Sequence, residues 1–292
     1  MSEGRQRAKA LDQAYAYCAS LARERDRDRW LSALFAPEAA RPHLHALAAF
    51  TCEIARVRAA AREPLAGEMR LAWWREALAG ERDSEAASHP VAAALIDTIA
   101  KFALPSAAFD DLLQARAFDL YDDAMATLAD LEAYCRSTAS ALFQLAALIL
   151  GEGRGVGAAE ASEAAGLAFG LTEVLRTFSQ SGARGPIYLP RDLLERHGAS
   201  LADVRARRDG AGLRAALAEL RELAERRLAE AETRVAALPA ILTPAFVPLG
   251  ALRLDLKRLR RTEASLFAPF AEAAAWRRQM ALWWWARGRR GA

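Results

Sequence analysis

The chain has 292 residues, enough to bury a sizeable core as one helical domain or two smaller ones. Its hydrophobic share of 53% is near the globular average, which argues against a disordered protein. The formal net charge of +3 is small and the charges are interspersed, so no nucleic-acid partner is expected.

Helices are the predicted elements throughout, because apolar residues recur at spacings of three and four along most of the chain. The polar N-terminal helix has no apolar signal core, so a cytoplasmic protein is expected. Pro37 and Pro42 precede a helix that is predicted over residues 46–61. Pro64 lies in the first turn of the next predicted helix.

Capping residues mark the start of the later helices. His89 is typical of a cap or of a polar core residue, and Pro90 then starts a helix. Thr127 and Asp130 have the spacing of a capping box, and an apolar run follows. A long charged helix is predicted to end near Leu238. No stretch reaches the roughly 18 uninterrupted apolar residues of a membrane span.

Few patterns in the chain match known catalytic or metal sites. Cys18, Cys52 and Cys135 have no CxxC spacing and are expected to be small core residues in a reducing compartment. The four histidines share no ligand spacing, and no serine lies in a G-x-S-x-G elbow. The glycine-rich segment 151–157 lacks a preceding strand and a following Lys-Ser/Thr pair. It therefore predicts a helix–helix turn rather than a phosphate loop.

Three aspartates are the candidate oxygen ligands. Asp119, Asp122 and Asp123 follow one another at i, i+3 and i+4, so one helical face could carry all three carboxylates. Such a face could hold Mg²⁺ through oxygen atoms. The alternative, which we favour, is a solvated helix end near a turn.

Several segments resemble the landmarks of the squalene/phytoene synthase family, in the order in which that family has them. These segments are residues 17–50, 70–80, 89–95, 130–151, 166–178 and 185–194. Each match is weak alone, but together they extend over roughly residues 10 to 260. The resemblance implies an all-α isoprenoid-synthase fold, a single helical bundle around a central cavity.

In that family, two facing aspartate clusters hold the Mg²⁺ ions that neutralise a diphosphate leaving group. The resemblance places other residues at these positions: Ala55, Arg56 and Ala59 in the first cluster, and Glu173, Thr177 and Ser181 in the second. Of the second motif, Arg176 is retained. The family's early serine-aromatic stretch is replaced by residues 26–30. The loss of both clusters removes the basis for metal binding, so no cofactor is expected.

The replacements suggest a different use of the two motif helices. Glu53 and Arg56 are three residues apart, as are Glu173 and Arg176. If the helices face each other, as the resemblance implies, these four charges could pair across the former cavity. Two separate surface ion pairs are the alternative. Arg56, Arg176 and Arg184 are also candidates for binding a diphosphate, together with Tyr188.

The altered motifs resemble the branch of the family that includes a mitochondrial complex I assembly factor. This resemblance implies a non-catalytic role in the maturation of NADH:ubiquinone oxidoreductase, with a subunit or assembly intermediate as partner. A Mg²⁺-dependent prenyltransferase is the alternative, with Glu53, Asp119, Asp122 and Asp123 as substitute ligands. A third possibility is a protein that binds an isoprenoid or another lipid without chemistry.

The C-terminal segment 271–292 is rich in tryptophan and arginine and is expected to form a helix and tail after the domain 1–270. Its four tryptophans are Trp276, Trp283, Trp284 and Trp285. Tryptophan with arginine suits the interface of an anionic membrane, which would place the protein peripherally on the inner face. A last helix that packs its tryptophans on the core is the alternative.

Overall fold

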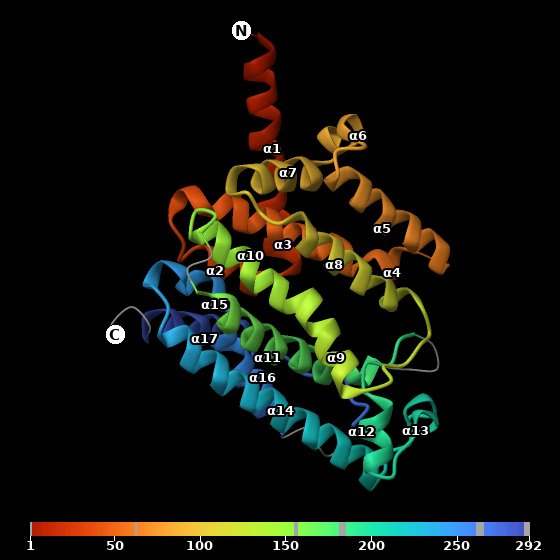
Figure 1. The fold of residues 1–292 in the computed structure, drawn as a ribbon. Coiled ribbons are helices and arrows are strands. Elements are labelled where there is room, and N and C mark those ends of the chain that lie inside the picture. Colours follow the sequence, from red (N-terminus) through yellow and green to blue (C-terminus); the bar gives the residue numbers. More distant parts are fainter. Residues whose placement is uncertain (1, 62, 155–156, 181–184, 261–265, 289–292) are drawn as a thin grey trace.

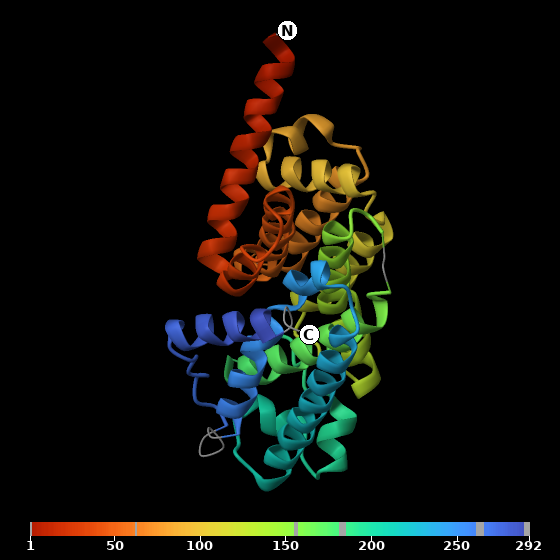
Figure 2. The same cartoon turned by 90° about the vertical axis from the view of Figure 1, so that its left-hand side faces the viewer.

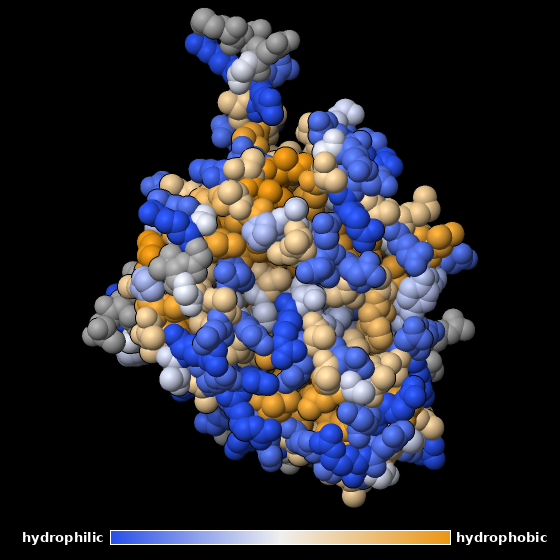
Figure 3. Space-filling view, viewed as in Figure 1, coloured by the Kyte–Doolittle hydropathy of each residue, from blue (hydrophilic) through white to orange (hydrophobic). Residues whose placement is uncertain are grey.

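The computed structural model describes residues 2–61, 63–154, 157–180, 185–260 and 266–288. Within these ranges the chain is helical, and its β structure consists of one isolated bridge between Ala124 and Ile187. The prediction of an all-α fold is confirmed. The N-terminal end of α1 (Ser2–Arg25) projects from the bundle (Figures 1 and 2), and this projecting part is largely hydrophilic (Figure 3).

The first half of the chain begins its helices where prolines and caps predict them. After α1 come α2 (Arg27–Ala33), η1 (Glu38–Ala40), α3 (Arg41–Ala55), α4 (Val57–Ala60), α5 (Pro64–Leu78), α6 (Asp83–Ser88), α7 (Pro90–Phe102) and α8 (Ser106–Arg116). The His89 ring caps α7 by accepting the Ala92 N–H at 3.3 Å. The helix predicted over 46–61 is wrong as one element, because it is interrupted at Arg56.

The second half contains the longest helix, α14, which has 26 residues. In chain order its helices are η2 (Ala117–Leu120), α9 (Leu128–Cys135), η3 (Arg136–Ser140), α10 (Ala141–Leu150), α11 (Ala159–Thr177), η4 (Phe178–Gln180), α12 (Arg191–Arg196), α13 (Leu201–Arg205), α14 (Ala211–Ala236), η5 (Ala240–Leu242), α15 (Thr243–Phe246), α16 (Leu249–Leu259) and α17 (Ala275–Gly288). The predicted capping box is confirmed, since Thr127 and Asp130 bond each other's backbone N–H groups.

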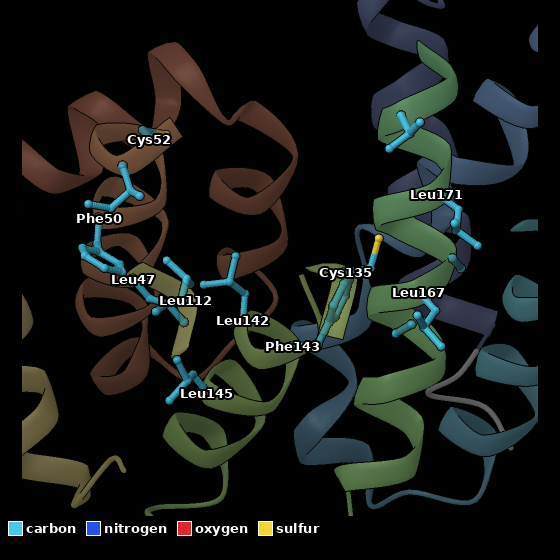
Figure 4. Close-up of a cluster of buried hydrophobic side chains, with 14 of the residues drawn as sticks. Leu47, Phe50, Cys52, Leu112, Cys135, Leu142, Phe143, Leu145, Leu167 and Leu171 are labelled. Carbon is cyan, nitrogen blue, oxygen red and sulfur yellow. The ribbon is translucent and has the colours of Figure 1, made fainter. Parts of the chain in front are cut away.

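One cluster of buried hydrophobic residues extends from α1 to α16. The helix α10 lies between α3 and α11 and packs its two sides against them (Figure 4). Leu142 lies on the side of Leu112 and Leu47, whereas Phe143 lies on the side of α11 (Figure 4). The Phe143 ring contacts the rings of Phe169 and Phe246, with centroids 6.0 and 5.8 Å away. The helix α10 therefore joins the two halves of the bundle.

The helices α9, η3 and α10 form one continuous run, in which η3 is a turn of π-helix. By length and composition, residues 128–150 form the one described helix that could cross a membrane, and 56% of the most apolar window is buried within the protein. Buried core helices have the same composition. At this π-turn, η3 and α11 lie very close together. A Cβ on Gly166 of α11 would lie 2.2 Å from the Ser140 backbone.

Buried ion pairs attach α17 to the bundle. The Arg278 guanidinium donates to both oxygens of Asp255 in α16, at 2.8 and 3.0 Å, and to Asp28 in α2 at 2.7 Å. Asp255 is fully buried, and its Oδ2 also lies 3.6 Å from Nη1 of Arg176 in α11. Burial raises the pKa of Asp255, and the two guanidinium groups oppose that effect. A single carboxylate thus links α11, α16 and α17.

The contact at Gly166 predicts the effect of a substitution. Gly166→Ala should lower the free energy of unfolding by about 1–3 kcal/mol, because α11 must move away from Ser140. Alanine's better helix propensity, about 1 kcal/mol, acts in the opposite direction. Urea unfolding followed by circular dichroism measures the difference. The control is Gly4→Ala on exposed α1, where a Cβ meets nothing within 4 Å; equal stability of both variants would contradict this packing.

The ion pairs at Asp255 predict a second effect. Asp255→Asn should destabilise the protein by about 3–5 kcal/mol, because two guanidinium groups lose their shared buried partner. Asp111→Asn on the exposed side of α8 should change stability by less than about 0.5 kcal/mol. Thermal and urea unfolding compare the two variants. A loss at Asp255 no larger than at Asp111 would mean that the buried ion pairs do not hold the C-terminal helix.

Candidate functional site

The first motif lies at the end of α3, where the chain turns into α4. Ala55, Arg56 and Ala59 are all exposed, and Arg56 is the C-cap residue of α3. Glu53 is half-buried one turn earlier. Its charge lies near α1, since it adds to burial in raising the pKa of the Cys18 thiol to about 12. The three positions that the resemblance assigns to aspartates therefore present no carboxylate.

The second motif lies in the last turns of α11. Arg176 pairs with Glu173 and with Glu272, besides its contact with Asp255. Thr177 donates its hydroxyl to the Glu173 carbonyl oxygen at 2.8 Å, as a helical threonine commonly does. Burial raises the pKa of Glu173, and Arg176 opposes this.

The prediction that Glu53 and Arg56 pair with Glu173 and Arg176 across the bundle is wrong. Arg176 is neutralised by Glu173, Glu272 and Asp255 rather than by Glu53. Arg56 is exposed, and the three-residue spacing from Glu53 crosses the end of α3. Sequence reasoning missed Asp255 and Glu272, because these residues lie about 80 and 100 positions beyond Arg176 and no local pattern connects them. Ser181 and Arg184, two further candidates, lie outside the described residues.

The segment 26–30, which replaces the family's serine-aromatic stretch, provides an internal ion pair. Asp26 caps α2 by accepting the Arg29 N–H at 3.1 Å, and its other oxygen lies 2.5 Å from Nη1 of Arg29. Both side chains are less than one-fifth exposed. The Arg29 guanidinium lies over the Phe169 ring of α11, with Cζ 4.8 Å from the centroid. A cation therefore lies between α2 and α11.

The interior cavity that Arg29 lines is small. It has about 30 Å³ and is bounded by α2, α3, α10 and α15, with Leu47 and Phe143 in its wall. Such a volume accommodates about two water molecules.

A larger cavity of about 380 Å³ lies on another side of α11. Its walls come from α11, α14, the end of α16 and the segment 266–270, and they combine Arg176, Arg214 and Arg221 with leucine and phenylalanine side chains.

The three candidate aspartates do not share a helical face, so that prediction is wrong. The helix η2 ends at Leu120, and Tyr121 is extended with φ −107° and ψ 162°. Asp122 and Asp123 follow in exposed turns, and Asp122 accepts hydrogen bonds from Arg58 at 3.0 Å and from the Gly185 N–H at 2.7 Å.

Asp119 belongs to a separate polar cluster. Its carboxylate accepts hydrogen bonds from Tyr134 at 2.7 Å, from Tyr188 at 2.6 Å and from Arg116 at 3.0 Å. Burial raises the pKa of both tyrosines. The favoured alternative of a solvated helix end therefore fits Asp122 and Asp123 but not Asp119. Tyr188, a candidate ligand-binding residue, is joined to η2 by its hydrogen bond to Asp119 and to α9 by the contact of its ring with Tyr134, whose centroid is 5.5 Å away.

The residues at the two motifs do not fit divalent magnesium. Mg²⁺ prefers carboxylate and water oxygens, whereas Ala55, Arg56 and Ala59 offer none and Thr177 donates its hydroxyl to the backbone. The carboxylate of Glu173 is paired with Arg176. Across the described part of the chain, no group of three or more histidine, cysteine, aspartate or glutamate side chains could hold a metal ion.

Comparison with known proteins places the fold. The sequence profile of the squalene/phytoene synthase family matches residues 22–284. NADH dehydrogenase (ubiquinone) complex I, assembly factor 6 of Rattus norvegicus is 28% identical over 259 residues, which cover 89% of this chain and 78% of that protein. The bifunctional protein CrtB/UppS of Streptomyces coelicolor is 30% identical over 197 residues, 67% of this chain and 34% of that protein.

Two solved structures agree with this placement. Squalene synthase HpnC from Alicyclobacillus acidocaldarius superposes with a TM-score of 0.70 at 26% identity and covers 87% of this chain and 96% of that one. A dehydrosqualene synthase in complex with ligand superposes with a TM-score of 0.79 at 19% identity, over 98% of this chain and 100% of that one. Because the family profile spans nearly the whole sequence, the chain belongs to the squalene/phytoene synthase family.

Proposed function

We propose that this protein is a non-catalytic member of the family that acts in the assembly or maturation of respiratory NADH:ubiquinone oxidoreductase. The observation that carries the proposal is the chemistry of the two motifs, where Ala55, Arg56 and Thr177 stand in place of metal-binding carboxylates. Similarity to complex I assembly factor 6 over 89% of the chain supports the choice of process. The proposed partner is a complex I subunit or an assembly intermediate.

Physical chemistry supports the loss of prenyl transfer. Departure of an allylic diphosphate leaves a polyanion that divalent metal must neutralise. The cavity of about 30 Å³ beside the Asp26–Arg29 ion pair is too small for a prenyl chain. The cavity of about 380 Å³ beside Arg176 is larger, but the described residues that line it include arginines and no aspartate or glutamate that could hold the metal. Arg56 remains exposed and could pair with a phosphate oxygen, so binding of a diphosphate without turnover agrees with the proposal.

Prenyl transfer is the second candidate function. It is favoured by the 26% identity with squalene synthase HpnC over 87% of this chain. Of the four substitute ligands, Asp119 is hydrogen-bonded within its own cluster. In the described structure the carboxylates of Glu53, Asp122 and Asp123 do not form a group that could hold a metal ion, so this function would require them to come together. A combined Glu53→Gln, Asp122→Asn and Asp123→Asn variant removes these carboxylates and spares that cluster, and it therefore separates the two functions.

Two measurements test the proposal. Purified protein with Mg²⁺ and farnesyl or geranylgeranyl diphosphate should form no squalene, phytoene or presqualene diphosphate above background in mass spectrometry of extracted products. The physical reason is that the first motif has no carboxylate and that the carboxylate of Glu173 in the second is paired with Arg176. In cells from which the gene is deleted, NADH-dependent respiration of isolated membranes should fall, whereas succinate-dependent respiration, which bypasses complex I, should not.

The triple variant is the control for both measurements. It should restore NADH-dependent respiration as well as the wild-type chain does. Metal-dependent product that the wild type forms and the triple variant does not would favour prenyl transfer. Unchanged NADH-dependent respiration after deletion would overturn the assembly role.

A further inference from the structure

The helix α17 has one side fixed to the bundle. Leu282 and Ala286 are buried against Val247 and Ala251, and Trp285 packs on them as well. The approach to α16 is close, because a Cβ on Gly250 would lie 2.8 Å from the Ala281 carbonyl oxygen. With the Arg278 ion pairs, these contacts hold the helix in one orientation.

The opposite side of α17 is apolar and uncovered. Trp276, Met280 and Trp284 are 61%, 43% and 63% exposed. Their spacing of four residues places them in one row along the helix, here called the tryptophan stripe. Figure 2 shows α17 at the periphery of the molecule, with one side directed away from the bundle.

The charged side chains of α17 itself have one sign. Residues 275–288 of α17 include no aspartate or glutamate. The Arg277 guanidinium lies over the Trp276 ring with Cζ 5.2 Å from its centroid, and the Arg287 guanidinium lies over Trp283 at 4.3 Å. Arg278 is neutralised by Asp28 and Asp255, so Arg277 and Arg287 supply the positive charge beside the stripe.

We propose that the tryptophan stripe binds an anionic lipid surface, with α17 lying in the plane of the headgroups. Indole rings suit headgroup depth, and arginines beside them suit anionic lipid. Leu65 and Met69 of α5 form another exposed apolar pair, which adjoins the exposed side chains of Glu63 and Glu68 as well as Arg70. These neighbours carry no net positive charge for an anionic lipid surface. The inference rests on α17 alone and is independent of the role in complex I assembly.

Sedimentation with vesicles tests this. Full-length protein should bind vesicles of equal parts phosphatidylcholine and phosphatidylglycerol at low salt, and phosphatidylcholine alone much less. The double substitution Trp276→Ser and Trp284→Ser should weaken vesicle binding on the order of tenfold or more, because the affinity scales with the apolar area that the helix buries in the lipid. Arg277→Gln with Arg287→Gln should weaken it by roughly fivefold for each arginine and reduce its salt dependence. Deletion of α17 is unsuitable as a test, because it also removes Arg278, the ion-pair partner of the buried Asp255.

Leu65→Ser with Met69→Ser is the matched control and should bind vesicles as the wild type does. All variants change exposed side chains, so their thermal unfolding should match that of the wild type. The proposal is overturned if the wild type stays in the supernatant or if the control and the tryptophan variant lose binding equally. It is also overturned if light scattering shows a dimer that the tryptophan substitutions dissociate while vesicle binding persists, since the stripe would then join two copies of this chain.

Discussion

The buried carboxylate of Asp255 is the constraint on which the C-terminal third of the structure depends. It is fully buried between Arg176 and Arg278, and a charge in that position is tolerated only because it is paired. Arg278 in turn reaches Asp28. The orientation of α17 follows from this arrangement, and with it the side of the helix that faces solvent.

The same arrangement changes the role of the retained arginine in the second motif. Arg176 forms ion pairs with three carboxylates of its own chain, those of Glu173, Asp255 and Glu272. Arg29 is held by Asp26, and its guanidinium lies over the Phe169 ring of α11. Both cations thus have partners within this chain. The fold of the family is combined here with ion pairs at the second motif and in the segment 26–30.

Small residues near the π-turn also have a packing role. Gly166 lets α11 approach Ser140 so closely that a methyl group would collide with the backbone. The side chain of Phe143 forms part of the wall of the cavity of about 30 Å³ beside Arg29.

The sequence alone determined the helices, their caps and the family. Helical period and capping are local properties, so Pro64, His89 and the Thr127–Asp130 box marked starts that the structure confirms. The absence of aspartates at the two motifs could also be read from the sequence. Only the tertiary structure decided the partners of Arg176, the separation of Asp119 from Asp122, and which tryptophans of α17 are exposed. These depend on contacts between residues far apart in the chain, and a break in helical geometry such as that after Leu120 redirects every side chain beyond it.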